Sequence, residues 1–255
     1  MPATQSATYS LITSLREKIF LAKAAFDNWF LERERLRQAD LRACLQTPWQ
    51  RFWGADYGLE MKEWLLKPVF ETLEAEGKAG DLIVDIGSGA QPVTRFLPAR
   101  PGRKRILVDV AADDAIHADE RRIRLNAEKV AEPSALSLLK ALVKAREFLD
   151  LSPGARLAGA DLMVFSDLLN YVDFRKVLRG FSTYLKPGGR LMISNLPMRG
   201  NESLFSENGL KDNRDLYKFL EAEHFIIEQK SFPCRAEGAT DEAEELIVLI
   251  ARKLA

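Results

Sequence analysis

The sequence predicts a doubly wound α/β sheet, and three observations support that prediction. Short apolar or β-branched runs recur from residue 82 onward, and they alternate with segments of helical periodicity. The chain has 255 residues and is 47% apolar, which is enough to bury one large α/β core. Strands that alternate with helices pair in parallel through right-handed crossovers, so we expect helices on both faces of one open sheet.

Seven runs are interpreted as strands and four segments as helices. The predicted strands are 82–86, 105–109, 121–125, 161–166, 190–195, 224–230 and 245–251. The predicted helices are 58–75 (despite Pro68), 134–150, 173–185 and 211–223. No convincing helix separates the last two strands, so they can pair antiparallel at one edge. The stretch 186-KPGG-189 is expected to form a tight turn before the fifth strand.

The first 57 residues differ in character from the rest. Apolar side chains recur at helical spacing up to about residue 36, and all four tryptophans lie within residues 29–64. The stretch 48-PWQRFWGADY-57 is aromatic and not periodic, and it is either a packed linker or a lid over a ligand. We therefore expect a helical cap or lid over residues 1–57 and a sheet domain over residues 58–255.

Charge and cysteine content narrow the class of protein. Lys plus Arg and Asp plus Glu are both 37, so the net charge is zero, which disfavours nucleic acid as a partner. Cys44 and Cys234 have no metal-ligand spacing, and His117 and His224 are both expected to be structural, so no metal site is predicted. The N-terminus lacks a signal peptide, and no apolar run approaches the ~20 residues of a membrane helix. A cytoplasmic protein is expected.

The stretch 82-LIVDIGSGAQP-92 is a strand followed by a glycine turn. Gly87 and Gly89 carry no Cβ atoms, so a ligand can lie against the main chain there. A nicotinamide fingerprint would need a third glycine where the chain has Pro92, and no Gly-Lys-Ser/Thr follows that would make a phosphate-binding Walker loop. Asp109 ends the next strand, where an acid can accept hydrogen bonds from a ribose diol. Asn126 follows the strand after that, where its amide could contact an adenine edge.

Five motifs together resemble those of the class I S-adenosylmethionine-dependent methyltransferases. In order they are VDIGSGAQP, LVDV, LNAE, FSDLLNYVD and YLKPGGRLMIS, and the resemblance covers roughly residues 58–255. It implies a Rossmann-like sheet of seven strands in the order 3-2-1-4-5-7-6, with strand 7 antiparallel. The DIGSG form looks most like small-molecule members of the nicotinamide and phenylethanolamine type. The family often has a third glycine where this chain has Gln91. Some small-molecule members also lack it, so this departure narrows the choice of subfamily that the chain resembles.

The resemblance implies S-adenosylmethionine as the cofactor and assigns residues to its parts. The assigned residues are Asp85, Gly87, Ser88 and Gly89 for the methionine end, Asp109 for the ribose, Asn126 and Ala127 for the adenine, and Ser166 and Asp167 for the sulfonium region. Val110 is also expected to bind the cofactor. Three of them have a simpler interpretation as well. Asp85 could brace the loop, Asp109 could be a surface acid that ends a strand, and Asn126 could be a turn residue.

The residues that would carry out the chemistry are harder to identify. Methyl transfer mainly requires alignment of the nucleophile with the methyl carbon, which can supply roughly 7–11 kcal/mol, and a general base is optional. Asn170 and Tyr171 follow the fourth strand and are the first candidates, with loop bracing and helix packing as their alternatives. Tyr57, in the possible lid, is the third candidate. Asp173 is expected to cap the following helix.

Three functions remain open at this stage. The leading hypothesis is methyl transfer to a small-molecule nitrogen or oxygen acceptor, held between the N-terminal cap and residues 195–209. The LNYVD segment and the aromatic cap also look like the enzymes that cyclise S-adenosylmethionine, the substrate in that case, to azetidine-2-carboxylate. Tyr57, Trp53, Asn170 and Tyr171 would form that site. The third hypothesis is a non-catalytic cofactor-binding partner subunit, with residues 7–46 as a dimerisation or docking stripe; a homodimer is possible.

Overall fold

A computed structural model of the chain describes residues 59–89, 91–110, 119–129, 159–197, 205–233, 242–243 and 245–254. Several sequence predictions lie outside the described residues. These are the cap over residues 1–57 with Tyr57, the helix 134–150, Cys44, Cys234 and His117. The two-domain boundary at residue 57 therefore stays a prediction.

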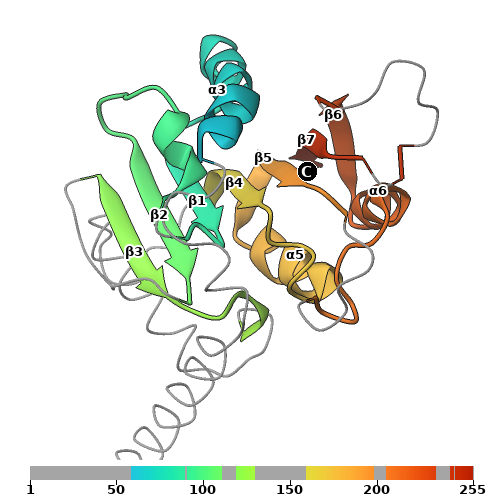
Figure 1. Ribbon diagram of the computed structural model, residues 1–255. Coiled ribbons are helices and arrows are strands. Elements are labelled where there is room, and N and C mark those ends of the chain that lie inside the picture. Colours follow the sequence, from blue (N-terminus) through green and yellow to red (C-terminus); the bar gives the residue numbers. More distant parts are fainter. Residues whose placement is uncertain are drawn as a thin grey trace, which may run out of the picture. The chain divides into compact units, whose positions relative to one another are not determined.

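The described residues form one seven-stranded sheet in the order β3-β2-β1-β4-β5-β7-β6 (Figure 1). Its strands are β1 (Leu82–Ile86), β2 (Lys104–Asp109), β3 (Glu120–Arg124), β4 (Ala160–Ser166), β5 (Leu185–Asn195), β6 (Phe225–Ser231) and β7 (Ile247–Lys253). The pairs from β3 to β5 are parallel, and β7 is antiparallel to both β5 and β6. This order and this single antiparallel strand confirm the predicted fold class.

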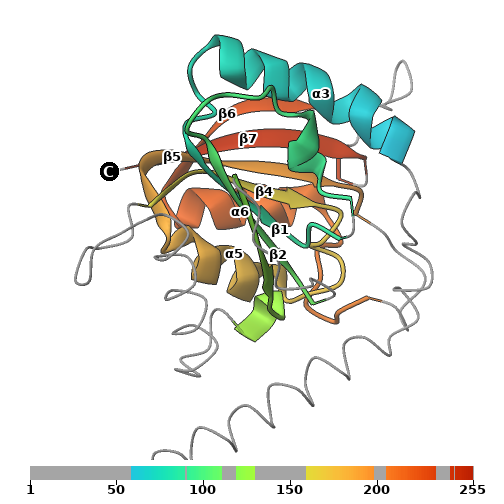
Figure 2. The same cartoon turned by 90° about the vertical axis from the view of Figure 1, so that its left-hand side faces the viewer.

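Helices cover both faces of the sheet, as Figures 1 and 2 show. α3 (Leu59–Ala75) lies on one face, and α5 (Phe174–Ser182) and α6 (Asn213–Ala222) lie on the other. Two short 3-10 helices, η1 (Val93–Phe96) and η2 (Ala127–Lys129), follow β1 and β3. Alternate residues of each strand therefore enter two separate cores. On β4, Leu162 and Val164 pack with α3, whereas Met163 and Phe165 pack with α5 and α6.

The sequence of each strand matches its place in the sheet. β1, β4 and β7 are nearly continuous apolar runs, and they are buried because both of their faces are covered. β6 lies at the edge and is mostly exposed, with Ile226 43% exposed. Edge strands that carry charge resist pairing with other chains, and β6 has Glu228 and Lys230 on it.

α3 forms across Pro68 because the proline lies on the exposed side of the helix. Pro68 has no N–H to donate to the Trp64 carbonyl, four residues earlier. Because this side of the helix is exposed, water can donate to that carbonyl instead. The helix is followed by Gly77 at φ +65°, whose N–H donates to the Glu74 carbonyl. A left-handed glycine is a common way to end a helix.

The stretch 186–189 is one place where the sequence prediction was wrong. It was predicted as a turn, but β5 begins at Leu185 and includes it. Ala160 pairs with Leu185 and Leu162 pairs with Arg190, so the strand bulges between these pairs. Gly188 takes φ +77° in the bulge, and a Cβ at Gly189 would lie 2.9 Å from the Ala160 carbonyl oxygen. The glycines thus serve a bulge within a strand rather than a separate turn.

No helix in the described part of the chain is both long enough and apolar enough to cross a membrane.

Candidate functional site

The sequence-predicted residues of β1, β2 and β4 meet at the carboxyl edge of the sheet. Ile86 pairs with Val108 on one side and with Phe165 on the other. The next residue of each strand is Gly87, Asp109 and Ser166 respectively, so these three lie side by side. In an open α/β sheet this edge, next to the first strand, is where ligands bind.

The glycine turn is held against β2 by main-chain hydrogen bonds. The N–H groups of Gly87 and Ser88 donate to the Val108 carbonyl at 2.8 and 3.3 Å. Gly87 and Gly89 have φ values of +72° and +59°, which L-residues rarely adopt. A Cβ at Gly87 would lie 3.0 Å from the Leu168 side chain, but no described atom lies within 4 Å of a Cβ added at Gly89. The turn is thus packed at Gly87 and open at Gly89.

Asp109 joins this turn to the end of β2. Its Oδ2 accepts a hydrogen bond of 2.9 Å from the Gly89 N–H, and the residue is buried to 9% exposure. It is therefore not the surface acid that the sequence also allowed. An ionised carboxylate has about four acceptor positions, so the bond to Gly89 does not by itself use up its capacity. Val110, the next residue, is also buried.

Asp85 is fully buried on the α3 side of the sheet and braces the loop after the turn. Its Oδ2 accepts from the Thr94 N–H at 3.2 Å and from the Thr94 hydroxyl at 2.9 Å. Burial raises the pKa of the carboxyl to about 6, although the Thr94 bonds and the charge of Lys62 oppose that rise. The hydrogen bonds fit the loop-bracing interpretation of Asp85, and its contact with a cofactor stays a prediction.

Asn126 and Ala127 form the turn after β3, and both are buried. The Asn126 Oδ1 accepts a 3.0 Å hydrogen bond from the Glu128 N–H, which is the local geometry of a turn-forming asparagine. The turn follows β3 directly, because the Leu125 N–H donates to the Asp109 carbonyl at 3.0 Å. This bond fits the turn-residue interpretation of Asn126, which lies on the same edge of the sheet as Asp109, and contact of Asn126 and Ala127 with an adenine stays a prediction.

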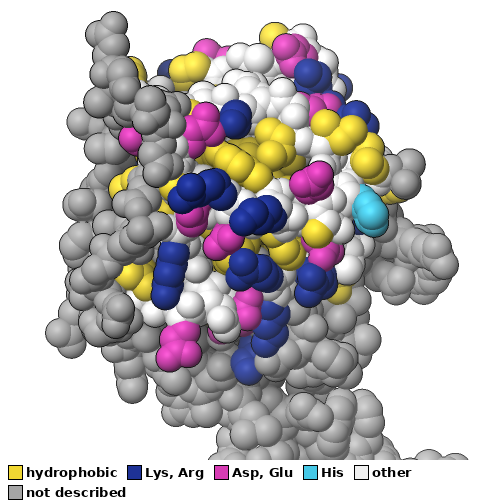
Figure 3. All heavy atoms as spheres, turned by 90° about the vertical axis from the view of Figure 1, so that its right-hand side faces the viewer, with side chains coloured by type: hydrophobic (Ala, Val, Ile, Leu, Met, Phe, Trp, Pro, Cys, Tyr) yellow, Lys and Arg dark blue, Asp and Glu magenta, His cyan; other side chains and the backbone are white. Residues whose placement is uncertain are grey.

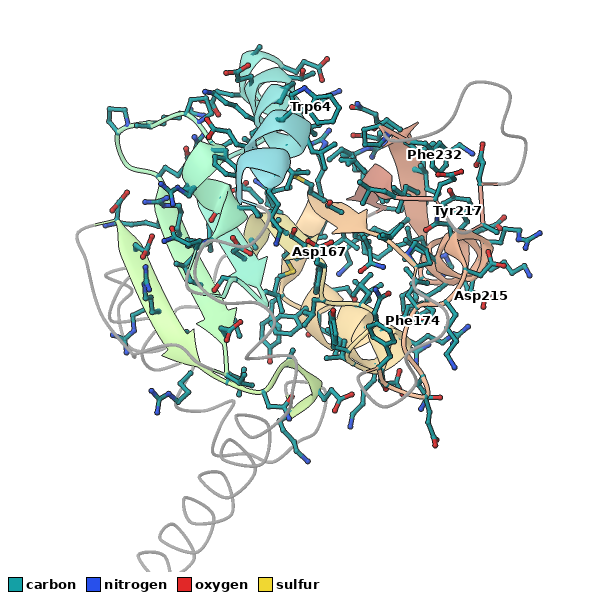
Figure 4. All side chains as sticks on the ribbon, in the orientation of Figure 1. Trp64, Asp167, Phe174, Asp215, Tyr217 and Phe232 are labelled. Carbon is teal, nitrogen blue, oxygen red and sulfur yellow. The ribbon has the colours of Figure 1, made fainter. Side chains whose placement is uncertain are left out.

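Polar side chains follow the apolar run of β4 at its carboxyl end. Ser166 is buried, and its hydroxyl has no hydrogen-bond partner within the described part of the chain. Asp167 takes φ +52° and lies at the middle of the carboxyl edge, as labelled in Figure 4. Its Oδ2 is 3.0 Å from the Nζ of Lys62, which comes from the first turn of α3. These groups put a hydroxyl, a carboxylate and an ammonium beside the glycine turn.

Asn170 and Tyr171 lie in the loop between β4 and α5. The Asn170 Nδ2 donates to the Leu196 carbonyl at 2.7 Å, and its Oδ1 accepts from the Asn195 Nδ2 at 2.9 Å. Both ends of this buried amide are thus used within the protein, which fits the loop-bracing alternative. The Tyr171 ring, half-buried, packs on the Phe205 ring at a centroid distance of 5.2 Å. Catalytic roles for Asn170 and Tyr171 stay predictions.

A groove of about 490 Å³ lies along α5, away from the strand ends. Arg175, Lys176 and Arg179 line it, together with residues at both ends of the helix. The Arg179 guanidinium is 2.7 Å from Glu223, and Arg175 is 4.0 Å from Asp215. Figure 3 shows this side of the molecule, where Lys and Arg side chains alternate with Asp and Glu. Because its arginines are paired with carboxylates, the groove has no strong excess charge for an anion.

Four residues at this edge were missed by the sequence interpretation: Lys62, Thr94, Glu128 and Asn195. Lys62 belongs to a helix that looked like scaffold alone, and Thr94 and Asn195 belong to no motif. Glu128 is the last letter of LNAE and was given no role. His224, by contrast, takes φ +60° directly before β6, which is the outermost strand of the sheet and lies away from β1 and β2. This position fits the structural role expected for His224.

Comparisons with known proteins found similarity in fold only. No protein-family model and no curated protein matches the chain. Among solved structures it is similar to the 1,6-didemethyltoxoflavin-N1-methyltransferase of Burkholderia thailandensis, at 18% identity and a TM-score of 0.46, over 77% of this chain and 81% of that one. It is also similar to the N-methyltransferase NodS of Bradyrhizobium japonicum, at 15% identity and a TM-score of 0.48, over 79% and 91%.

A third similar structure is the CurJ carbon methyltransferase, at 15% identity and a TM-score of 0.44, over 76% of this chain and 54% of that one. The fold is the class I methyltransferase fold. The strand order with its antiparallel seventh strand defines that fold, independently of these distant likenesses. What the chain binds and which reaction it performs are inferred from its own residues.

Proposed function

We propose that the chain is an S-adenosylmethionine-dependent methyltransferase that acts on a nitrogen or oxygen atom of a small molecule. One observation carries the proposal: the open glycine turn, the buried Asp109 and the Ser166 hydroxyl, which has no partner among the described residues, lie side by side at the carboxyl edge. A nucleoside with a charged tail needs a carboxylate for its ribose, exposed main chain for its tail and polar groups near its reacting centre. The residues present fit that need.

When bound, S-adenosylmethionine would supply a methyl group on an electrophilic sulfonium. The residues of this chain would bind and orient it. Asp109 would accept from the ribose hydroxyls, and the main chain at Gly89 would lie along the methionine tail. Ser166 and Asp167 would face the sulfonium region, with Lys62 next to Asp167. Methyl transfer depends mainly on alignment of the reacting atoms. Residues that hold the cofactor in place therefore support the proposed transferase, and no catalytic base is required.

The proposal predicts that Asp109 dominates cofactor affinity. We expect Asp109→Ala to weaken binding of S-adenosylhomocysteine at least about tenfold, because a lost hydrogen bond to a charged group costs about 1.5–3 kcal/mol. Asp109→Asn keeps one acceptor and should lose less. Isothermal titration calorimetry measures both. Asp81→Ala removes an exposed acid at the opposite end of β1 and serves as the matched control.

Product analysis separates the three functions considered from the sequence. The protein is incubated with S-adenosylmethionine alone and then with a metabolite extract, and small molecules are identified by mass spectrometry. S-adenosylhomocysteine that forms only with extract, together with a metabolite heavier by one methyl group, supports a methyltransferase. Methylthioadenosine with azetidine-2-carboxylate would instead show a cyclase. Binding of S-adenosylmethionine without turnover in either incubation would favour the cofactor-binding partner subunit, and failure to bind it at millimolar concentration would contradict all three functions.

A further inference from the structure

The N-terminus of α5 has a capping arrangement that the helix completes only in part. Asp173 is the N-cap residue, and its Oδ1 accepts a 3.0 Å hydrogen bond from the Lys176 N–H. In a capping box, the side chain at the third helical position reciprocates by accepting from the N-cap N–H. That position is Lys176, whose ammonium group can only donate hydrogen bonds and so cannot accept from the N-cap N–H. The N–H of Asp173 must therefore find its acceptor outside the helix.

Glu128 provides that acceptor from 45 residues away in the sequence. Its Oε1 accepts from the Asp173 N–H at 2.7 Å, a distance typical of a charge-assisted hydrogen bond. A carboxylate at the N-terminus of a helix also interacts favourably with the helix dipole. The capping box of α5 is thus completed by a residue of η2 rather than by the helix itself.

The same residue is tied to the turn after β3. The Glu128 N–H donates to the Asn126 Oδ1 at 3.0 Å. Glu128 therefore uses its main chain to shape the turn of Asn126 and Ala127, and its side chain to hold the first turn of α5.

The loop held by Glu128 is itself a braced unit. The Leu169 N–H donates to the Asn195 Oδ1 at 3.2 Å, and Asn195 in turn bonds Asn170. The Ser206 N–H donates to the Asn170 carbonyl at 3.0 Å. These bonds tie Leu169 and Asn170 to the end of β5 and to Ser206, so the loop that Glu128 holds at Asp173 is anchored at both of its ends.

We propose that Glu128 is a positioning residue that couples the adenine-side turn of the cofactor site to the acceptor-side loop 167–173. The inference rests on the function proposed above. A cofactor that orders the turn at Asn126 then also orders the first turn of α5 and the loop before it. By linkage the effect is reciprocal, so an ordered acceptor loop also favours cofactor binding.

Four variants test this coupling. Glu128→Ala removes the acceptor, and Glu128→Gln keeps a neutral one in the same place. The double variant Glu128→Ala with Lys176→Glu builds the capping box within the helix, without a link to η2. Glu71→Ala removes an exposed carboxylate of α3 and is the matched control. The measurements are the affinity for S-adenosylhomocysteine and the hydrogen exchange of the Asp173 amide with and without it.

In the wild type we expect S-adenosylhomocysteine to slow exchange of the Asp173 amide at least about tenfold. Glu128→Ala should lose this response and bind about tenfold more weakly, whereas Glu128→Gln and Glu71→Ala should stay within about threefold of the wild type. The double variant should regain slow exchange in the absence of ligand but neither the response to ligand nor the affinity. If Glu128→Ala does not fold, the double variant and Glu128→Gln carry the test.

Three results would overturn the coupling. If Glu128→Ala binds and responds as the wild type does, Glu128 couples nothing, while the proposed function stands. If the double variant regains affinity along with stability, Glu128 is only a helix cap. If the wild type does not bind S-adenosylhomocysteine at all, the proposed function fails first and the coupling falls with it.

Discussion

Asp85 shows how a single residue changes meaning between sequence and structure. In the sequence it is the acid of a cofactor motif, one residue before the strand ends. In the structure its carboxylate is buried under α3 and bonded to Thr94. The raised pKa follows from that burial, because an ionised group loses its hydration there.

The raised pKa of Asp85 makes a prediction about stability. Between pH 3.8 and about 6 the folded protein keeps a proton that the unfolded chain releases, so stability from this group is complete below pH 3.8 and is lost as the pH rises through about 6. The full change is about 3 kcal/mol at 1.36 kcal/mol per pH unit. Urea unfolding of the wild type and Asp85→Asn between pH 4 and 7.5 measures it. A stability difference between the two that does not vary with pH would contradict the burial argument.

At the scale of elements, the antiparallel edge depends on one acidic residue at a strand irregularity. Arg190 of β5 and Arg252 of β7 are direct cross-strand partners, which places like charges opposite each other. Glu228 lies where the register of β6 shifts, and its carboxylate is 2.8 Å from Arg190 and 2.7 Å from Arg252. The strand irregularity thus directs an acid between two arginines.

We expect Glu228→Gln to lower the free energy of unfolding by about 1 kcal/mol at neutral pH and low salt. Burial alone would raise the pKa of Glu228, but the hydrogen bonds from Arg190 and Arg252 outweigh it and the pKa is lowered. The stabilisation is therefore present above the ordinary carboxylate pKa and is lost as the pH falls through the lowered value. Chemical denaturation at neutral and acidic pH, and at 1 M salt, tests this.

The exposed Glu221 of α6 offers the control for that change. Glu221→Gln also removes one surface charge, but it leaves the arginine pair untouched, so it should alter stability by less than about 0.5 kcal/mol. Equal effects of the two substitutions at every salt concentration would show that net charge, and not the arrangement across the three strands, is responsible.

At the scale of the whole molecule, the described chain is a sheet with a separate apolar core on each face. The α3 side depends on a single described α-helix, whose Leu66 and Phe70 are completely buried against the sheet, with the short η1 beside it. The other side is covered by α5 and α6 and forms the larger cluster. Because α3 is also the helix that carries Lys62 to Asp167, its packing and the candidate site are connected.

Two substitutions in α3 test its part in the molecule. Phe70→Ala should cost about 3–5 kcal/mol, since it removes a buried ring and leaves a cavity against the sheet. Trp64→Ala, in the same helix but 66% exposed, should change stability by less than about 0.5 kcal/mol. Thermal unfolding of both variants decides the matter. A large cost at Trp64 would mean that this indole is covered in solution by another part of the molecule.

Patterns that are local in sequence were predicted correctly. Alternation of apolar runs and helical segments predicted every described strand and α-helix, but not the short 3-10 helices η1 and η2. The absence of a convincing helix between the last two strands predicted the antiparallel edge. The glycines of 87–89 and the cap at Asp173 were also foreseen, because turn and cap preferences act over a few residues. The turn predicted at 186–189 was wrong because a bulge depends on the partner strand, which local preferences do not include.

The sequence by itself determined the fold class and the edge of the sheet where a ligand can bind, since hydrophobic period and glycine placement are written residue by residue. Only the tertiary structure decided what individual polar groups do there. Asp85 braces Thr94, Asn170 is bonded to Asn195 and Leu196, and Glu128 completes the cap of a helix 45 residues away. The bonds of Asn170 and Glu128 join segments that only the folded sheet brings together, and no spacing in the sequence encodes their distance.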